Sequence, residues 1–109
     1  MNLTFFGVRG LRVSENTVDQ MHFVYIVRCA DGTLYTGYAG DPVQRERTHN
    51  AGRGARYTSG RRPVRLVYSE ECASRGEALK REHQIKRRTR REKEALVRAS
   101  RSRAPRGAR

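Results

Sequence analysis

The sequence has few cysteines, little acidic charge and no long apolar run, and each shortage excludes a class of protein. No apolar stretch approaches the roughly 18 residues that a membrane-spanning helix needs. Two cysteines, Cys29 and Cys72, provide neither a disulfide framework nor a C-x-x-C metal pair, and we interpret them as reduced thiols of a cytoplasmic protein. The apolar residues 3–10 are too few for a signal peptide and include Arg9. We therefore expect no membrane or secreted function.

Positive charge is abundant and unevenly placed. The 109 residues hold 24 lysines and arginines against 11 acidic residues, a formal net charge of +13. Residues 80–109 carry thirteen basic and three acidic side chains, whereas residues 1–20 carry equal numbers of basic and acidic side chains. Such a cationic segment attracts polyanions through counterion release. Nucleic acid is the predicted partner class, because the segment has few large apolar groups to insert into an anionic membrane. A solvated basic tail without a specific partner is the alternative.

Composition also predicts the boundaries of the folded part. Hydrophobic residues make up only 36% of the chain, which suits one small domain. The sequence patterns typical of strands and helices begin at Met21, so we expect a domain over residues 21–98. Residues 1–20 are predicted to be an extension or a misassigned start. Residues 99–109 are predicted to be a basic disordered tail, because they contain no large apolar side chain.

Local signals predict a β-β-α-β-α-α order for this domain. Apolar, β-branched and aromatic runs predict the strands, and Asp41-Pro42 predicts a helix start. Ser74 and Thr89 each fit a capping box with a glutamate three residues later. The expected strands are 23–29, 34–38 and 64–69, the expected helices are 41–50, 74–87 and 89–98, and residues 53–63 are expected to be a loop. The fold class is therefore α+β, a small sheet covered by helices.

One carboxylate lies on an apolar helix face. Ala78, Leu79 and Ile85 have helical spacing, and Glu82 falls on or beside the stripe that they form. A carboxylate in that position is costly unless it is paired or binds a metal. A salt bridge to a neighbouring arginine and a metal or catalytic role both remain open.

A second group of residues is suited to a phosphate ester. Arg45 and His49 are four residues apart and share one helix face, where a guanidinium can bind phosphate and an imidazole can exchange a proton. A solvated helix face is the alternative. Tyr25 and Tyr35 lie on the two strands of the predicted hairpin, where plain packing would also explain them. Gly37 weakens its strand, which often marks a close backbone approach, for example to phosphate.

Together these residues resemble a known family. Residues 24–26 (VYI) and 35–37 (YTG) resemble the paired tripeptides of the GIY-YIG nuclease domain, and Arg45 and His49 follow at the family's spacing. The stretch 49–58 (HNAGRGARYT) resembles that of the short standalone bacterial branch. Residues 62–68 (RPVRLVY) and 77–86 (EALKREHQIK) extend the resemblance over about residues 22–98.

The resemblance implies a three-stranded antiparallel sheet flanked by helices and an endonuclease that hydrolyses DNA phosphodiesters with one Mg²⁺ or Mn²⁺ ion, in DNA repair or processing. It implies that Glu82 is the metal ligand and that Arg45 contacts the scissile phosphate. Tyr25 would be the general base and Tyr35 would orient the water. His49 would lie near the same site and is the alternative base, because a tyrosine titrates near pH ~10.

Binding of DNA would depend on the domain face and the basic block, since no separate recognition domain is evident. The predicted nucleic-acid contacts are Arg53, Arg56, Lys80, Lys86, Arg87 and Arg88. Some family members carry a lysine directly after the second tripeptide, and here that residue is Tyr38. No small-molecule cofactor is expected. A non-catalytic module that binds DNA or RNA, and a structural protein with a solubilising tail, remain the alternatives.

The hairpin provides a test of the two-tyrosine site. Side chains alternate between the faces of a strand. A two-residue Asp31-Gly32 loop would therefore send Tyr25 and Tyr35 to opposite faces. A shared site predicts an odd-length loop or a bulge between residues 29 and 38.

Overall fold

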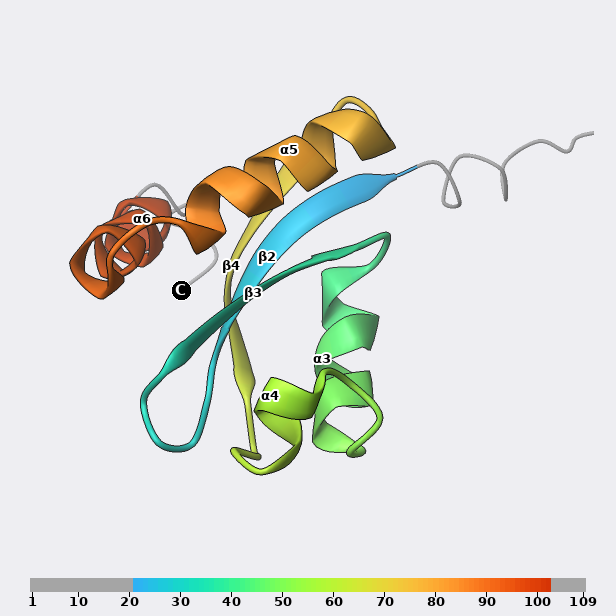
Figure 1. Ribbon diagram of the computed structural model, residues 1–109, viewed down its shortest axis with the longest axis vertical. Coiled ribbons are helices and arrows are strands. Elements are labelled where there is room, and N and C mark those ends of the chain that lie inside the picture. Colours follow the sequence, from blue (N-terminus) through green and yellow to red (C-terminus); the bar gives the residue numbers. More distant parts are fainter. Residues whose placement is uncertain (1–20, 103–109) are drawn as a thin grey trace, which may run out of the picture.

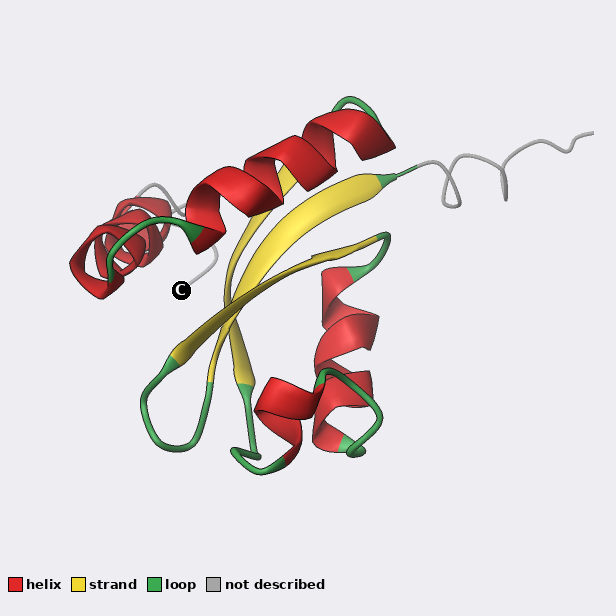
Figure 2. Cartoon of the chain, viewed as in Figure 1, coloured by secondary structure: helices red, strands yellow, loops and turns green. Residues whose placement is uncertain are grey.

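The computed structural model describes residues 21–102, and the predicted N-terminal extension lies outside them. Three antiparallel strands form a sheet in the order β3-β2-β4, so β2 is central and β3 is an edge strand. Helices lie on both sides of the sheet, with α5 on one side and α3 and α4 on the other (Figures 1 and 2). The elements in chain order are β2 (His22–Arg28), β3 (Leu34–Ala39), α3 (Pro42–Asn50), α4 (Arg56–Ser59), β4 (Arg65–Cys72), α5 (Arg75–Lys86) and α6 (Arg90–Ser102). The fold is α+β, as predicted.

The hairpin loop between β2 and β3 has an odd length. The Cys29 amide donates to the Thr33 carbonyl at 2.8 Å and the Gly32 amide donates to the Cys29 carbonyl at 2.9 Å, with Gly32 at φ +87°. This is a three-residue loop closed by a left-handed glycine. In the resulting register Tyr25 pairs with Gly37 and Tyr35 pairs with Val27. The two tyrosines therefore lie on the same face of the sheet, which confirms the prediction.

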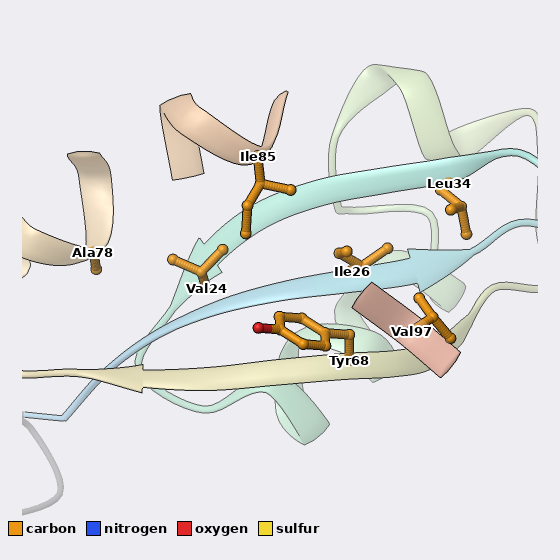
Figure 3. Close-up of a cluster of buried hydrophobic side chains, with 7 residues drawn as sticks. All are labelled: Val24, Ile26, Leu34, Tyr68, Ala78, Ile85 and Val97. Atoms are coloured by element: carbon orange, nitrogen blue, oxygen red, sulfur yellow. The ribbon is translucent and has the colours of Figure 1, made fainter. Parts of the chain in front are cut away.

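The alternation of side chains divides the core in two. One cluster lies between the sheet and helices α5 and α6, and Figure 3 shows its seven buried members. The other cluster lies on the tyrosine face, toward α3 and α4. The first comprises Val24, Ile26, Leu34, Tyr68, Ala78, Ile85 and Val97, and the second Tyr25, Val27, Cys29, Ala39 and Val64. Both cysteines are free thiols.

The predicted helix starts are confirmed. The Asp41 carboxylate accepts the Gln44 amide at 3.1 Å, and Pro42 occupies the first turn of α3. Ser74 caps α5 by accepting the Glu77 amide at 3.1 Å. Thr89 and Glu92 form a reciprocal capping box before α6.

Three boundaries differ from the prediction. The predicted loop over residues 53–63 contains the short helix α4, which has no apolar period but is held by buried Thr58. Strand β4 continues to Cys72, beyond the predicted end at residue 69, because it pairs with β2 as far as His22. Helix α6 reaches Ser102, so residues 99–102 are not part of a disordered tail. Alanine and arginine extend an established helix readily, and residues 103–109 lie outside the described part.

None of the helices described within residues 21–102 has the length and apolar character required to cross a membrane.

Candidate active site

Three side chains from three elements form a buried hydrogen-bonded chain. The Tyr25 hydroxyl lies 2.8 Å from His49 Nε2, and His49 Nδ1 lies 2.8 Å from the Thr58 hydroxyl. The Thr58 hydroxyl donates its single proton to the Ala55 carbonyl at 2.9 Å, so it accepts from Nδ1 of the imidazole. The neutral His49 ring therefore carries its proton on Nδ1, and Tyr25 donates to Nε2. The relative exposure of both Tyr25 and His49 is 1%.

Burial keeps both groups of this pair uncharged. Burial is the largest cause that raises the pKa of Tyr25 to about 12, with the charges of Tyr35 and Glu82 adding to it and Arg45 opposing it. Burial, followed by the positive charge of Arg45, lowers the pKa of His49 from its usual 6.5. At neutral pH the imidazole is therefore a free base that holds a hydrogen bond from a phenol.

Two glycines make room for these rings. A side chain on Gly37 would meet the Tyr25 hydroxyl at 2.5 Å, because the tyrosine ring crosses from β2 over β3. A side chain on Gly54 would overlap Nδ1 of His49. The close approach predicted for Gly37 is thus made by Tyr25. An approach of phosphate to its backbone stays a prediction.

Tyr35 continues the site outward as part of an aromatic stack. Its ring meets His49 edge-on, with centroids 5.5 Å apart. It stacks on Tyr57 at 5.8 Å with an interplanar angle of 22°. The Arg61 guanidinium lies 4.0 Å from the centroid of the Tyr57 ring. The predicted tyrosine pair therefore converges on His49, as a shared site requires.

The two charged groups of the site come from opposite sides of the sheet. Arg45 lies on α3, one turn before His49, and its positive charge opposes the rise in the pKa of Tyr25. Glu82 lies on α5, and its charge also acts on Tyr25. Because the Tyr25 hydroxyl lies over the edge strand β3, side chains from both layers can meet there.

Glu82 follows the buried face of α5, as predicted, but Leu79 does not. Ala78 and Ile85 are fully buried, whereas Leu79 is 40% exposed. Residues 78, 82 and 85 differ by four and three positions and share one face, while residue 79 is rotated by about 100° from residue 78. The Glu82 side chain is 18% exposed and pairs with Lys86 Nζ at 3.3 Å. Its ion-pair partner is thus a lysine one turn away, rather than the arginine considered above.

Helix α3 is itself fixed by side chains that the sequence analysis did not single out. The Asn50 side chain accepts the Val64 amide at 2.7 Å and donates to the Val64 carbonyl at 3.0 Å. Glu46, one turn earlier, accepts the Leu66 amide at 2.7 Å. These contacts join α3 to the segment that leads into β4 and to β4 itself, and so set the position of His49. Thr58, Gly54 and Asn50 all lie within the family-like stretch 49–58, which was the signal available for them.

The six predicted nucleic-acid contacts are all exposed but do not form one surface. Lys86 lies beside the site, with Nζ 6.0 Å from the centroid of the Tyr35 ring. Arg87 and Arg88 follow it at the end of α5, and Arg53 and Arg56 flank the start of α4. Lys80 lines a separate pocket with Glu70, Glu71 and Glu77. Tyr38, at the position of the family lysine, lies within hydrogen-bonding distance of His22 (Nδ1 to Oη 2.9 Å).

Comparison with known proteins identifies the family of this chain. The sequence model of the GIY-YIG catalytic domain matches residues 21–95. A UPF0213 protein from Staphylococcus aureus is 58% identical over 76 residues, which cover 70% of this chain and 93% of that protein. A solution structure of a protein from E. faecalis is similar, with 36% identity, a TM-score of 0.53 and coverage of 79% of this chain and 92% of the other. A UPF0213 protein from Bacillus halodurans has 46% identity, a TM-score of 0.48 and coverage of 72% and 84%. The chain belongs to the GIY-YIG catalytic domain family.

Proposed function

We propose that this protein is a metal-dependent endonuclease that hydrolyses phosphodiester bonds of DNA. The observation that carries the proposal is the buried hydrogen-bonded chain Tyr25–His49–Thr58, whose tyrosine is influenced by the charges of both Arg45 and Glu82. Family membership supports a nuclease-type site, and the net charge of +13 supports a polyanionic substrate.

The hydrogen-bonded residues Tyr25, His49 and Thr58 can together move a proton away from an attacking water. Tyr25 accepts the proton of the water as it passes its own proton to Nε2 of His49. A free phenolate, which a pKa of about 12 makes costly, is then never needed. Thr58 accepts from Nδ1 throughout and stabilises the imidazolium that results. In this scheme Tyr25 touches the nucleophile and His49 is the base that finally holds the proton.

Arg45 provides the positive charge for the phosphate. It is an exposed residue one turn before His49, and its charge reaches both Tyr25 and His49. A guanidinium binds two phosphate oxygens at once and keeps its charge at every physiological pH. Arg45 would thus orient the scissile phosphate toward the Tyr25 hydroxyl.

The residues present suit one hard divalent ion. Within residues 21–102 no three His, Cys, Asp or Glu side chains gather into a cluster that could hold a metal, so Glu82 would be the principal protein ligand. Mg²⁺ accepts this arrangement, because it binds through one or two carboxylates, substrate phosphates and several waters. When bound, Mg²⁺ or Mn²⁺ stabilises the charge that develops on the phosphate. In this structure the Glu82 carboxylate is paired with the Lys86 ammonium at 3.3 Å.

Cleavage by wild type and Glu82→Gln tests the proposal. Both proteins are incubated with single-stranded, duplex, nicked and forked DNA and with RNA, in Mg²⁺, in Mn²⁺ and in chelator. Glu71→Gln, an exposed carboxylate on β4, is the matched control. We expect DNA cleavage that requires metal, disappears in Glu82→Gln and persists in Glu71→Gln. Salt-sensitive binding without cleavage of any substrate would instead indicate a non-catalytic nucleic-acid module.

A further inference from the structure

A small pocket adjoins the aromatic stack on the side away from His49. It has a volume of about 200 Å³ and is lined by Thr33, Leu34, Tyr57, Arg90 and Lys93. Tyr57 belongs both to this pocket and to the stack on Tyr35. The pocket is therefore joined through Tyr57 and Tyr35 to His49 of the candidate active site.

The pocket joins an aromatic wall to a cationic one. Tyr57 is 39% exposed, and because Tyr35 and Arg61 lie against its ring, its edge and hydroxyl are the parts that can contact a sugar or a base. Opposite it, α6 contributes Arg90 and Lys93. Lys86 comes from α5 and lies over the neighbouring Tyr35 ring at 6.0 Å. Aromatic and cationic side chains in this combination are typical of sites that bind nucleic-acid strands.

Lys93 lacks the ion-pair partner that each of its cationic neighbours, Arg90 and Lys86, has among the described residues. Arg90 is paired with Glu94 at 3.7 Å and donates to the Gly32 carbonyl, and Lys86 is paired with Glu82. Among the residues that the structure describes, Lys93 has no ion pair. It is half-buried, and burial followed by the charge of Lys86 lowers its pKa. A half-buried cation without an ion pair is stabilised when an anion binds beside it in the pocket.

We propose that this pocket is a nucleotide subsite, in which Lys93 and Lys86 bind the phosphate next to the scissile one and Tyr57 contacts its nucleoside. The inference rests on the proposed function and deepens it, because it identifies a second substrate unit that the enzyme would hold. Anchoring a neighbouring nucleotide would fix the scissile bond relative to Arg45 and Tyr25. It would also give this small domain a defined point of contact with the strand.

Binding to the intact chain in chelator tests the subsite without hydrolysis. The probes are thymidine 5′-monophosphate and inorganic phosphate, followed by NMR shifts of Leu34, Tyr57 and Lys93, and a short DNA oligonucleotide, followed by fluorescence anisotropy at several salt concentrations. Lys93→Met preserves the length of the side chain and removes the charge, and Arg75→Met, which removes an exposed cation at the start of α5, is the control. For Lys93→Met we expect weaker binding and a salt slope smaller by about 0.7 to 0.9, the value for one phosphate contact. Tyr57→Leu should weaken the binding of thymidine 5′-monophosphate and leave the binding of inorganic phosphate unchanged.

The outcomes separate this inference from the proposed function. Unchanged nucleotide binding and salt slope in Lys93→Met, with shifts confined to other surfaces, would overturn the subsite even if wild type cleaves DNA. Loss of nucleotide binding in Lys93→Met without any cleavage by wild type would support the subsite and contradict the nuclease. If the protein is a nuclease and the pocket is its subsite, Lys93→Met should raise KM for DNA more than it lowers kcat.

Discussion

The Tyr25 hydroxyl and Nε2 of His49 are 2.8 Å apart in the interior of the protein, and the proton between them belongs to the tyrosine. This direction follows from a third residue, because Thr58 gives its own proton to the Ala55 carbonyl and can only accept from the other imidazole nitrogen. A pair ordered in this way is ready to transfer a proton from the tyrosine to the histidine.

If Tyr25 and His49 act as one relay, their substitutions should not add. We expect Tyr25→Phe and His49→Gln each to lower kcat by about 10²- to 10⁴-fold, the usual contribution of general base catalysis. The double variant should be no slower than the slower single variant. Single-turnover cleavage measures the three rates, with circular dichroism to verify folding. Multiplied losses in the double variant would show that the two residues act independently.

Thr58 should influence the reaction through the imidazole alone. Thr58→Val removes the acceptor for Nδ1 and no longer fixes the tautomer, so we expect kcat to fall at least about tenfold with little change in KM. Thr58→Ser keeps the hydroxyl and should retain most of the activity. The comparison of kcat for the two variants checks this, and equal losses would assign Thr58 to packing only.

The pH dependence should report His49 rather than Tyr25. Because the pKa of His49 is lowered from 6.5 by burial and Arg45, the imidazole stays neutral to below that value. We expect kcat/KM to be flat above neutral pH and to fall only on acidification. Arg45→Met should move the acid limb to higher pH, since one cause of the lowered pKa is removed. A rate that keeps rising toward the Tyr25 pKa of about 12 would identify the phenolate as the base.

The same shift affects stability. The unfolded chain binds the His49 proton more tightly than the folded protein does. The free energy of unfolding should therefore fall as the pH drops through 6.5, and this contribution should be present above that value. Urea unfolding of wild type and His49→Gln at several pH values measures it.

Gly37→Ala should displace the tyrosine. The added methyl group would lie 2.5 Å from the Tyr25 hydroxyl, so the ring must move away from His49 or the strands must separate. We expect a large loss of kcat together with reduced stability. Gly60→Ala is the control, because no atom lies within 4 Å of the added group there. Full activity of Gly37→Ala would show that Tyr25 can act from another position.

Asn50 should contribute mainly to stability. Asn50→Ala leaves the amide and the carbonyl of Val64 without their side-chain partner, and we expect a loss of about 1–3 kcal/mol. Asn50→Asp keeps the acceptor for the amide and should lose less. Chemical denaturation of the three proteins gives these differences, and an unchanged midpoint for Asn50→Ala would show that α3 is held elsewhere.

The local signals of the sequence determined most of the secondary structure. Asp41-Pro42, Ser74 and Thr89 define helix starts because each satisfies free amides within its own first turn. The requirement that Tyr25 and Tyr35 share a face predicted the odd loop, since the period of a strand is two residues. The helix starts are short-range effects that neighbouring residues alone determine, whereas the odd loop was deduced from the shared site that the family resemblance implies.

Only the tertiary structure decided how the candidate site is held. That Tyr25 donates its proton to His49, and not the reverse, depends on Thr58. Thr58 lies on a helix that no periodic pattern predicted. The space for the Tyr25 ring depends on its crossing over Gly37 of the neighbouring strand, and Leu79 is exposed because Ala78 and Ile85 turn another face of α5 to the sheet. Such relationships join residues that are far apart along the chain. They follow from packing and from hydrogen bonds between separate elements, which the pattern of adjacent residues does not contain.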